Sequence, residues 1–227
     1  MVSAHSQATE DYLKIIYKLI ARHGRATTTQ IAEQLDVTPA SVTGMLQKMA
    51  QAAPPLLEYK KHRGVTLTAA GEKAALEIVR HHRLLELFLQ KTLDYSWDEV
   101  HDEAERLEHV ISEEMERRIA EYLGHPLVDP HGHPIPNYDL EMTPTAAFPL
   151  SELRPGQQAI IRRVRDEDDD LLRYLDQQGL RIATCVTAVD FISFDHNLHL
   201  RIDGRPDPVV VGPKVTSQIF VELLETA

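Results

Sequence analysis

Residues 124–149 contain six prolines, whereas residues 56–123 contain none. Proline lacks an amide hydrogen and has a fixed φ, so it interrupts helices and is rare in central strands. The segment 124–149 therefore predicts a linker between separately folded regions. The hydrophobic pattern also changes at this point, from a helical period before the linker to a strand-like period after it.

The first 50 residues predict three helices. Apolar residues recur every three or four positions over residues 9–22, which is typical of an amphipathic helix. A short helix is predicted over residues 28–35. After a turn, Thr38 provides an N-cap and Pro39 occupies a first helical position, so a third helix begins there.

A predicted β-hairpin follows these helices, with strands at residues 56–59 and 65–67 around a basic turn. Three helices and a hairpin predict a winged helix-turn-helix. Small polar side chains on the outward face of the third helix suit a major groove, and the basic turn suits phosphate contacts. The residues predicted to contact DNA are Thr38, Pro39, Ala40, Ser41, Thr43, Gln47, Lys48, Lys60, Lys61 and Arg63. The alternative is a protein-interaction module with a solvated polar face.

The rest of the chain predicts two long helices and then a β module. Thr68 caps a helix that runs toward Leu93. The capping box Ser96–Glu99 begins a second helix that continues to about Leu123 and is ended by Gly124. Beyond the linker, one helix is expected near residues 168–178. Strands are predicted over residues 157–164, 181–189, 198–202 and 219–224. The expected fold is mainly α with a small β module, which has the size of an SH3-like barrel.

The net charge of the whole chain conceals three different regions. With 24 Lys and Arg against 35 Asp and Glu, the net charge is -11, which by itself argues against nucleic-acid binding. Residues 1–75, however, carry nine basic and six acidic residues, a net charge of +3. Residues 76–149 carry six basic and sixteen acidic residues, together with seven of the 12 histidines. The first region is compatible with DNA, and the second suggests neutralisation by a divalent cation.

Composition also excludes several classes of protein. The single cysteine, Cys185, excludes an internal disulfide framework and any cysteine-based zinc or iron–sulfur site. No stretch reaches 18 apolar residues, and the first ten residues lack the features of a signal peptide. We therefore expect neither secretion nor membrane spanning.

Histidines and carboxylates recur at helical spacing in the middle region. In a single helix over residues 96–123, His101, Glu105, Glu108 and His109 lie within an arc of about 100°. On the preceding helix, His82 and Glu86 are one turn apart. The opposite face of the 96–123 helix is expected in the core and carries Leu107, Val110, Ile111 and Met115. Nitrogen and oxygen donors without thiolate suit a first-row divalent metal. The alternative is a solvated charged face.

Two other features have simpler explanations when they are considered alone. Asp11 at the start of the first helix favours the helix dipole. His131-Gly132-His133 has metal-binding side chains, but a polar turn within the linker is the favoured explanation.

Four segments make the chain similar to the diphtheria toxin repressor family, which includes the manganese transport regulators. They are TEDYL at residues 9–13, HRLLE at 82–86, VHDEAERLEH at 100–109 and PHGHPIP at 130–136. The resemblance implies a winged helix-turn-helix domain over residues 1–75 and a helical dimerisation and metal-binding domain with the linker over 76–148. An SH3-like, FeoA-like domain is implied over residues 149–227. The implied function is a cytoplasmic homodimeric repressor, not an enzyme, that binds palindromic operator DNA when loaded with metal.

The resemblance also implies two metal sites. The first would use Asp11, Glu105, Glu108 and His109. The second would use His82, Glu86 and His101, completed by Glu167 and Asp170 from an acidic run whose register is ambiguous by one or two residues. Iron-type members have methionine and cysteine where this chain has Asp11 and Glu105, and the manganese type has a glutamate at the position of Lys14. Carboxylates in place of sulfur favour Mn²⁺, with Fe²⁺ as the alternative.

Two other functions remain open at this point. Histidine and glutamate pairs on neighbouring helices also build di-metal oxidases and hydrolases, although the sequence offers no evident nucleophile or substrate pocket. A winged-helix regulator that responds to a ligand other than metal is the second alternative.

Overall fold

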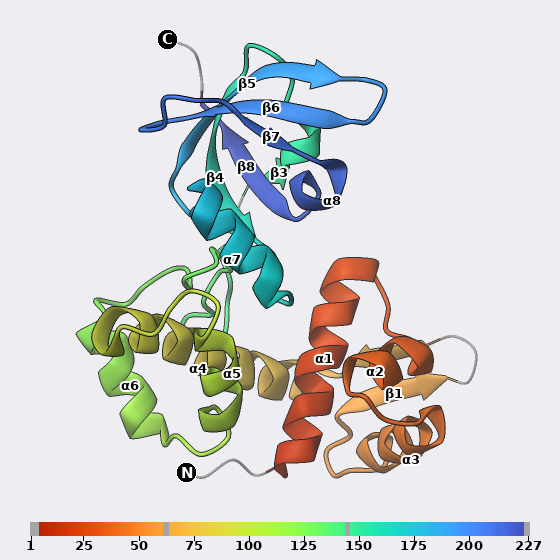
Figure 1. Cartoon of the computed structure of the whole chain (residues 1–227). Helices are drawn as coiled ribbons and strands as arrows, with labels where there is room; N and C mark the ends of the chain where they lie inside the picture. Colours follow the sequence, from red (N-terminus) through yellow and green to blue (C-terminus); the bar gives the residue numbers. More distant parts are fainter. Residues whose placement is uncertain (1–4, 61–63, 144–145, 225–227) are drawn as a thin grey trace. The chain divides into compact units, whose positions relative to one another are not determined.

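The computed structural model describes residues 5–60, 64–143 and 146–224 and is shown in Figure 1. Lys61 and Arg63, which were predicted to contact DNA, lie outside the described residues. The chain divides into two compact units. The first unit comprises Met1–Leu84, Glu105–Gly124 and Pro136–Glu141, and the second comprises Leu85–Ala104, His125–Ile135 and Met142–Ala227.

The first unit contains the three predicted N-terminal helices. They are α1 (Gln7–His23), α2 (Thr28–Gln34) and α3 (Pro39–Ala50). Helix α1 ends at Gly24, whose φ of 74° lets its amide bond back to the Ile20 carbonyl. Thr38 caps α3 by accepting a hydrogen bond from the Ser41 amide, which confirms the predicted start of this helix. The buried core that joins them includes Leu13, Ile16, Ile31, Val42, Leu46 and Met49.

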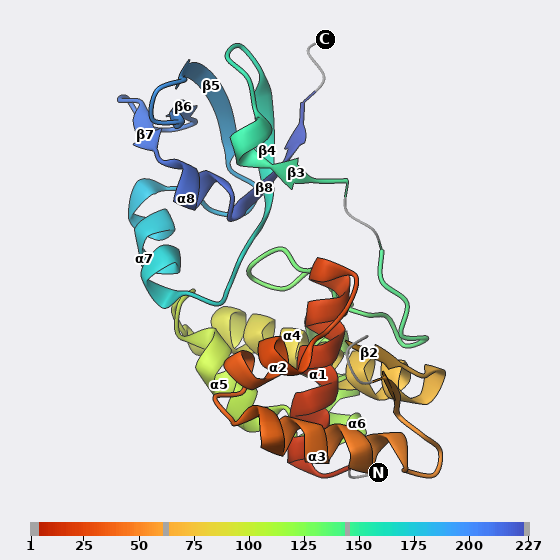
Figure 2. The same cartoon turned by 90° about the vertical axis from the view of Figure 1, so that its right-hand side faces the viewer.

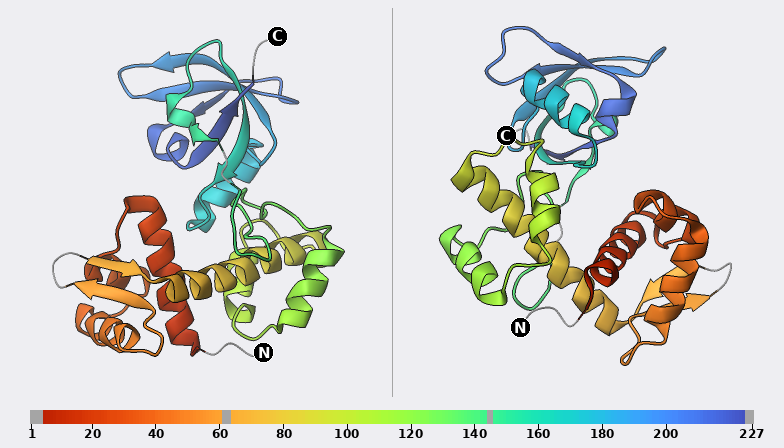
Figure 3. Two further views of the ribbon diagram at one scale, coloured as in Figure 1. Left: turned by 180° about the vertical axis from the view of Figure 1, so that it is seen from behind. Right: turned by 60° about the horizontal axis from the view of Figure 1, so that its bottom comes forward.

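A two-stranded hairpin completes the winged helix. Strand β1 (Leu57–Lys60) pairs antiparallel with β2 (Gly64–Leu67), and Figure 3 shows this hairpin beside α2 and α3. Leu57 and Val65 face the core formed by the helices. The predicted winged helix-turn-helix is confirmed.

Helix α4 (Ala69–Leu93) follows, and its start is capped by Thr68 as predicted. The single helix expected over residues 96–123 is wrong. Instead α5 (Val100–Leu107) ends early, and α6 (Glu113–Tyr122) begins at its own N-cap, Ser112, which accepts a hydrogen bond from Met115. Ser112 followed by acidic residues favours a helix start, and this local preference overrides continuation of the preceding helix.

The break in the helix also overturns the expected core face. Val110 and Met115 are 73% and 46% exposed, and Leu107 and Ile111 are only partly buried. Val100, Ala104, Ile119 and Ala120 are buried instead. The first unit therefore presents apolar side chains on its surface in this region.

The second unit contains a six-stranded antiparallel sheet in the order β3-β8-β4-β5-β6-β7. The strands are β3 (Phe148–Pro149), β4 (Gln158–Val164), β5 (Cys185–Ile192), β6 (Asn197–Ile202), β7 (Val209–Val211) and β8 (Ile219–Leu223). A 3-10 turn (Leu150–Glu152) and helices α7 (Asp169–Gln178) and α8 (Pro213–Thr216) accompany them, as Figure 2 shows. Four of these strands match the predictions, although β5 begins later than expected, at Cys185.

The predicted linker is partly wrong, because residues 125–135 are an ordered part of the second unit. Asp129, His131 and Ile135 are almost fully buried. The indole of Trp97 donates a hydrogen bond to the Pro130 carbonyl, and Asp129 bonds the amides of His131 and His133. Prolines here interrupt regular structure without preventing burial.

Within the described residues, no helix has the length and apolar character needed to cross a membrane.

Candidate metal centres

The first candidate centre, defined by Asp11, Glu108 and His109, lies in the first unit. Asp11 comes from α1, whereas Glu108 and His109 follow the end of α5. His109 Nε2 is 2.9 Å from Asp11 Oδ1 and 3.4 Å from Glu108 Oε1. One ligand atom from each residue lies within 4.8 Å of the other two. The early end of α5 thus brings two residues far along the chain onto the N-terminal helix.

Glu10 orients the imidazole of the first centre, a role that was not predicted from the sequence. Its Oε2 lies 2.6 Å from His109 Nδ1, and the Glu10 side chain is only 6% exposed. Because a carboxylate accepts at Nδ1, the Nε2 atom remains available as a ligand and points toward Asp11 and Glu108. A carboxylate behind a histidine in this way fixes the tautomer and increases the basicity of a metal ligand.

Lys14 occupies the space between Glu105 and Glu108. Its buried ammonium donates hydrogen bonds to Glu105 Oε1 at 2.6 Å and Glu108 Oε1 at 2.5 Å. Burial lowers the pKa of Lys14, but the two carboxylates outweigh that effect and hold its pKa above the usual value. Glu105, predicted as a ligand together with Asp11, is therefore bound by Lys14 and is not within the three-residue group that contains Asp11.

The other Glu108 oxygen contacts His82. His82 Nδ1 is 2.5 Å from Glu108 Oε2, and both side chains are buried. His82, Glu105 and Glu108 form a second group of ligand atoms within 4.8 Å of one another. Burial raises the pKa of Asp11, and although His109 and Lys14 act against this, the pKa stays above its usual value. Because burial disfavours the Asp11 carboxylate, a positive charge placed beside it would stabilise the ionised form.

A cavity of about 390 Å³ in the first unit borders this centre. Its wall includes Glu10, Glu108 and His109, together with Arg80 and Tyr138. The cavity therefore reaches two of the three residues of the first centre, Glu108 and His109.

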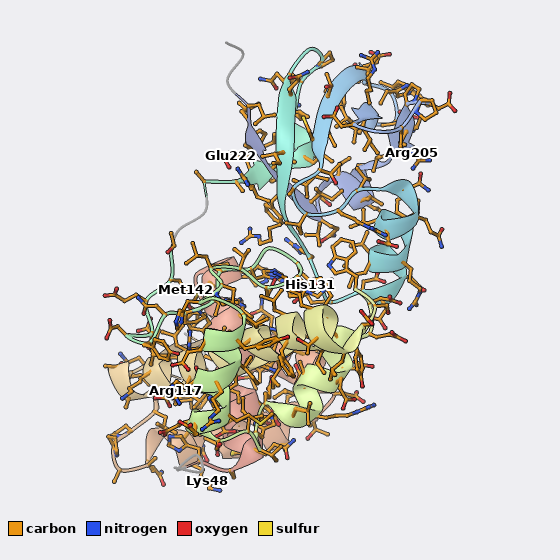
Figure 4. The ribbon with its side chains drawn as sticks, turned by 90° about the vertical axis from the view of Figure 1, so that its left-hand side faces the viewer. Lys48, Arg117, His131, Met142, Arg205 and Glu222 are labelled. Carbon is orange, nitrogen blue, oxygen red and sulfur yellow. The ribbon has the colours of Figure 1, made fainter. Side chains whose placement is uncertain are left out.

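The second candidate centre, defined by Glu86, His131 and Asp166, lies in the second unit. All three residues are buried, and one ligand atom from each lies within 4.8 Å of the others. Glu86 comes from α4, His131 from the loop labelled in Figure 4, and Asp166 from the segment between β4 and α7. Glu86 also contacts His101, whose Nδ1 is 3.1 Å from Glu86 Oε1. The residues predicted for the second site, His82, Glu86 and His101, also come together, since one ligand atom from each lies within 4.8 Å of the other two. His82 bonds Glu108 as well.

His131 is held with one nitrogen directed at the carboxylates. Its Nε2 lies 2.9 Å from the Trp97 carbonyl oxygen, and its ring stacks on the Trp97 ring at a centroid distance of 5.6 Å. Its Nδ1 has no hydrogen bond to any residue that the structure describes and lies 3.9 Å from Glu86 Oε2. Burial lowers the pKa of His131, but Glu86, Asp129 and Asp166 together raise it to about 9.

Residues on either side complete the surroundings of the second centre. His133 Nδ1 is 3.3 Å from Asp129 Oδ2 and 3.7 Å from Asp166 Oδ2. Glu167 and Asp170 are exposed, and Asp170 pairs with Arg173. Within the acidic run it is therefore Asp166 that turns inward, one residue before the predicted Glu167. Neither Asp166 nor the burial of His131 was predicted from the sequence.

Comparisons with known proteins match all three regions of the chain. Residues 5–65 match the iron dependent repressor N-terminal DNA binding domain, residues 68–137 the iron dependent repressor metal binding and dimerisation domain, and residues 148–223 the FeoA domain. The HTH-type transcriptional regulator MntR of Oceanobacillus iheyensis is 43% identical over 103 residues, which cover 45% of this chain and 68% of that protein. The Bacillus subtilis regulator of the same name is 40% identical over 103 residues, which cover 45% of this chain and 70% of that protein.

Solved structures resemble the whole chain. A manganese-dependent transcriptional repressor in complex with manganese has a TM-score of 0.86 and 35% identity, covering 95% of this chain and 100% of that one. The T. acidophilum IdeR structure has a TM-score of 0.76 and 29% identity, covering 98% and 100%. The chain belongs to the iron-dependent repressor family. Its relatives are transcriptional repressors, so the enzyme alternative has no support.

In this family member the donor atoms of both centres fit a divalent metal ion. The first centre offers two carboxylates and an imidazole nitrogen aimed between them. The second offers two buried carboxylates and His131 Nδ1, a buried nitrogen whose ring is already bonded on the other side. Oxygen and nitrogen donors of this kind suit Mn²⁺ and Fe²⁺.

The predicted DNA-binding residues of this repressor-family chain lie mainly on the surface. Thr43, within α3, is partly buried, and its hydroxyl donates a hydrogen bond to the Pro39 carbonyl oxygen at 2.9 Å. Lys60 at the end of β1 is 65% exposed, and its ammonium lies 3.3 Å from the exposed carboxylate of Glu58. The exposed residues are Thr38, Pro39, Ala40, Ser41, Gln47 and Lys48, of which Lys48 is labelled in Figure 4.

Proposed function

We propose that this chain is a Mn²⁺-activated repressor that binds palindromic operator DNA as a cytoplasmic homodimer, with Fe²⁺ as the alternative activator. The observation that carries the proposal is the first centre. It takes Asp11 from the DNA-binding domain and Glu108 and His109 from the metal-binding and dimerisation domain. A ligand set shared between these two domains suits a metal-dependent switch of DNA binding.

The side chains of the first centre would couple metal to the position of α1. A bound divalent ion would supply the positive charge that holds the Asp11 and Glu108 carboxylates together. Asp11 lies near the start of α1, and α1 packs in the same core as the recognition helix α3. Holding α1 therefore restrains α3, and in a dimer this would favour the spacing of about 34 Å that matches successive major grooves. Metal and operator must then increase each other's affinity by the same factor.

The choice of metal follows from the donors. Both centres consist of carboxylates and imidazoles, and neither uses the only cysteine, Cys185. Such hard donor sets favour Mn²⁺ over softer ions, although Fe²⁺ binds similar ligands. Relatives described as manganese-dependent repressors support the same choice.

The exposed apolar side chains of the first unit support a dimer. Val110, Met115 and Tyr122 are 73%, 46% and 71% exposed, and all lie within the matched dimerisation domain. Large apolar side chains that are exposed within a dimerisation domain favour an interface over a solvated surface. We expect two copies to bury this region against each other.

DNA binding in the presence and absence of metal tests the proposal. An operator is first selected from random duplexes with Mn²⁺-loaded protein, and binding is then measured by fluorescence anisotropy at fixed salt. We expect Mn²⁺ to increase operator affinity at least about 100-fold, with Fe²⁺ under anaerobic conditions as the comparison. Equal affinity with Mn²⁺ and with a chelator would contradict the proposal. Size-exclusion chromatography with light scattering tests the dimer separately.

A further inference from the structure

Lys14 is a buried cation inside a group of metal-ligating side chains. Its side chain is 2% exposed, and its ammonium contacts the partly exposed Glu105 and the fully buried Glu108. A buried ammonium is stable only where carboxylates compensate the loss of its hydration. Lys14 and these two carboxylates therefore form one unit in which the lysine supplies the positive charge.

The geometry around Glu108 contains two positions for a cation. Asp11, Glu108 and His109 surround one, and His82, Glu105 and Glu108 surround the other. Two groups that share one carboxylate have the general arrangement of a centre for two ions. The Lys14 ammonium bonds both carboxylates of the second group. In the first group it bonds only the shared Glu108, so Asp11 and His109 Nε2 remain for an ion.

We propose that Lys14 is a built-in cation that takes the second of these positions, so that the centre binds a single divalent ion beside a fixed ammonium. This inference rests on the proposed metal-binding function. Lys14 also belongs to α1, whereas Glu105 and Glu108 belong to the end of α5 and the turn that follows. The same ion pairs therefore hold α1 against this segment before any metal binds, and Lys14 is a positioning residue for the domain that carries α3.

Counting bound ions tests the single-ion claim. In Lys14→Glu, the new carboxylate ends one bond short of the ammonium position and leaves a space lined by three carboxylates and His82. Native mass spectrometry with Mn²⁺ is expected to find one more ion per chain in Lys14→Glu than in the original protein. Electron paramagnetic resonance should then show a spin-coupled Mn²⁺ pair, because two ions that share Glu108 would lie about 3.5–4 Å apart. An unchanged ion count in folded Lys14→Glu overturns the proposal.

Lys18→Glu is the matched control, because Lys18 lies one turn later on the same helix. It makes the same change of charge and is expected to leave both the ion count and the resonance spectrum unchanged. An additional ion in Lys18→Glu as well would assign the gain to overall charge and would overturn the role of Lys14.

The metal-free protein gives a second, independent readout. Lys14→Met keeps most of the side-chain volume but removes the charge, leaving Glu105 and Glu108 to repel each other. We expect amide hydrogen exchange in α1 to become at least tenfold faster in metal-free Lys14→Met and to remain unchanged in Lys18→Met. Unchanged exchange in Lys14→Met would overturn the positioning role.

Ion counts in His109→Ala and Lys14→Glu distinguish failure of the proposed metal-binding function from failure of the Lys14 inference. If His109→Ala binds as many ions as the original protein, the centre binds no metal, and the proposed function fails together with the single-ion claim. The faster exchange of α1 in metal-free Lys14→Met would still be expected, because it depends only on the ion pairs. If His109→Ala loses one ion as expected but Lys14→Glu gains none, only the Lys14 inference is contradicted.

Discussion

The two candidate centres differ in the cation that balances their carboxylates before metal binds. In the first centre the cation is the ammonium of Lys14, which bonds Glu105 and Glu108. In the second it is the imidazolium of His131, because Glu86, Asp129 and Asp166 outweigh burial and raise its pKa to about 9. The ammonium is permanent and does not occupy the ligand atoms of His109. The proton on His131 occupies a ligand nitrogen and must leave when a metal binds.

This difference suggests separate roles for the two centres. The first centre keeps α1 partly restrained without metal, so an ion there adjusts an existing contact between α1 and the turn after α5. The second centre joins the part of α4 that starts at Leu85, the loop around His131 and the segment before α7, which all belong to the second unit. We therefore expect changes in the first centre to alter DNA binding and changes in the second to alter the stability of its own unit. Four predictions test this distinction.

The largest effect is expected from His109→Ala. Removing this imidazole leaves Asp11 and Glu108 with too few ligands to hold an ion, so α1 loses its metal-dependent restraint. Operator affinity in saturating Mn²⁺ should fall by about 10³-fold, to the level of non-specific binding. Fluorescence anisotropy measures this loss, and light scattering should show that the dimer persists. His23→Ala, which removes an exposed histidine from the end of α1, is the control and should bind operator normally. Full activation of His109→Ala by Mn²⁺ would be incompatible with the first centre.

His131→Gln should weaken Mn²⁺ binding in the second unit, whereas His109→Ala weakens operator binding. Trp97 is the only tryptophan and stacks on His131, so its fluorescence should respond to Mn²⁺ in the original protein. In the variant we expect Mn²⁺ affinity at this centre to fall at least about 100-fold, the upper end of losses from altered surroundings alone. The metal-dependent increase in the thermal midpoint should also disappear. His199→Gln in β6 is the control. An unaltered Trp97 titration in His131→Gln would refute the second centre.

The sequence predicted the winged helix-turn-helix well because its signals are local. The Thr38 cap, the proline after it and the apolar period of α1 all act within a few residues. The end of α5 was missed because the stripe of His101, Glu105, Glu108 and His109 suggested a continuous helix. The N-cap at Ser112, followed by Glu113 and Glu114, is a local signal that could have revealed the break.

The residues of the second centre were harder to predict because their burial depends on contacts between distant segments. His131 lies in a proline-rich segment that predicted a linker, and its pairing with Asp166 depends on a loop folding against β4. Gly132 was an available clue, since its φ is 85° and a Cβ there would approach the Arg162 carbonyl oxygen to 1.9 Å. Only glycine permits this close approach, which places the neighbouring His131 beside the strand that leads to Asp166.

Glu10→Gln examines a positioning residue of the first centre without removing a ligand. Glutamine has the same shape but no charge, so it holds His109 less firmly and decreases the basicity of Nε2. We expect Mn²⁺ affinity at the first centre to fall about 10–100-fold, the range found when a carboxylate behind a histidine ligand is lost. The operator should still be bound at high Mn²⁺ concentration, in contrast to His109→Ala. Glu33→Gln, which changes an exposed residue of α2 in the same way, is the control and should leave Mn²⁺ affinity unchanged. An effect as large as that of His109→Ala would show that Glu10 itself is a ligand.

The pH dependence of Mn²⁺ binding separates the two resident cations. His131 has a folded pKa of about 9 in the metal-free protein, above the usual 6.5, so its proton stabilises the fold fully below pH 6.5. That contribution is lost as the pH rises through 9. Mn²⁺ competes with the same proton, and its affinity for the second centre should therefore increase by up to about tenfold per pH unit from 6.5 to 9.

Anaerobic titrations followed by Trp97 fluorescence measure this slope, and thermal midpoints of the metal-free protein should decrease over the same pH range. His131→Gln should remove the decrease in the thermal midpoint. The Lys14 ammonium keeps its proton throughout this range, since its pKa lies above the ordinary value for lysine. Deprotonation of Lys14 should therefore not increase Mn²⁺ affinity at the first centre as the pH rises. An increase of Mn²⁺ affinity with pH at the second centre alone would distinguish the permanent ammonium of Lys14 from the displaceable proton of His131.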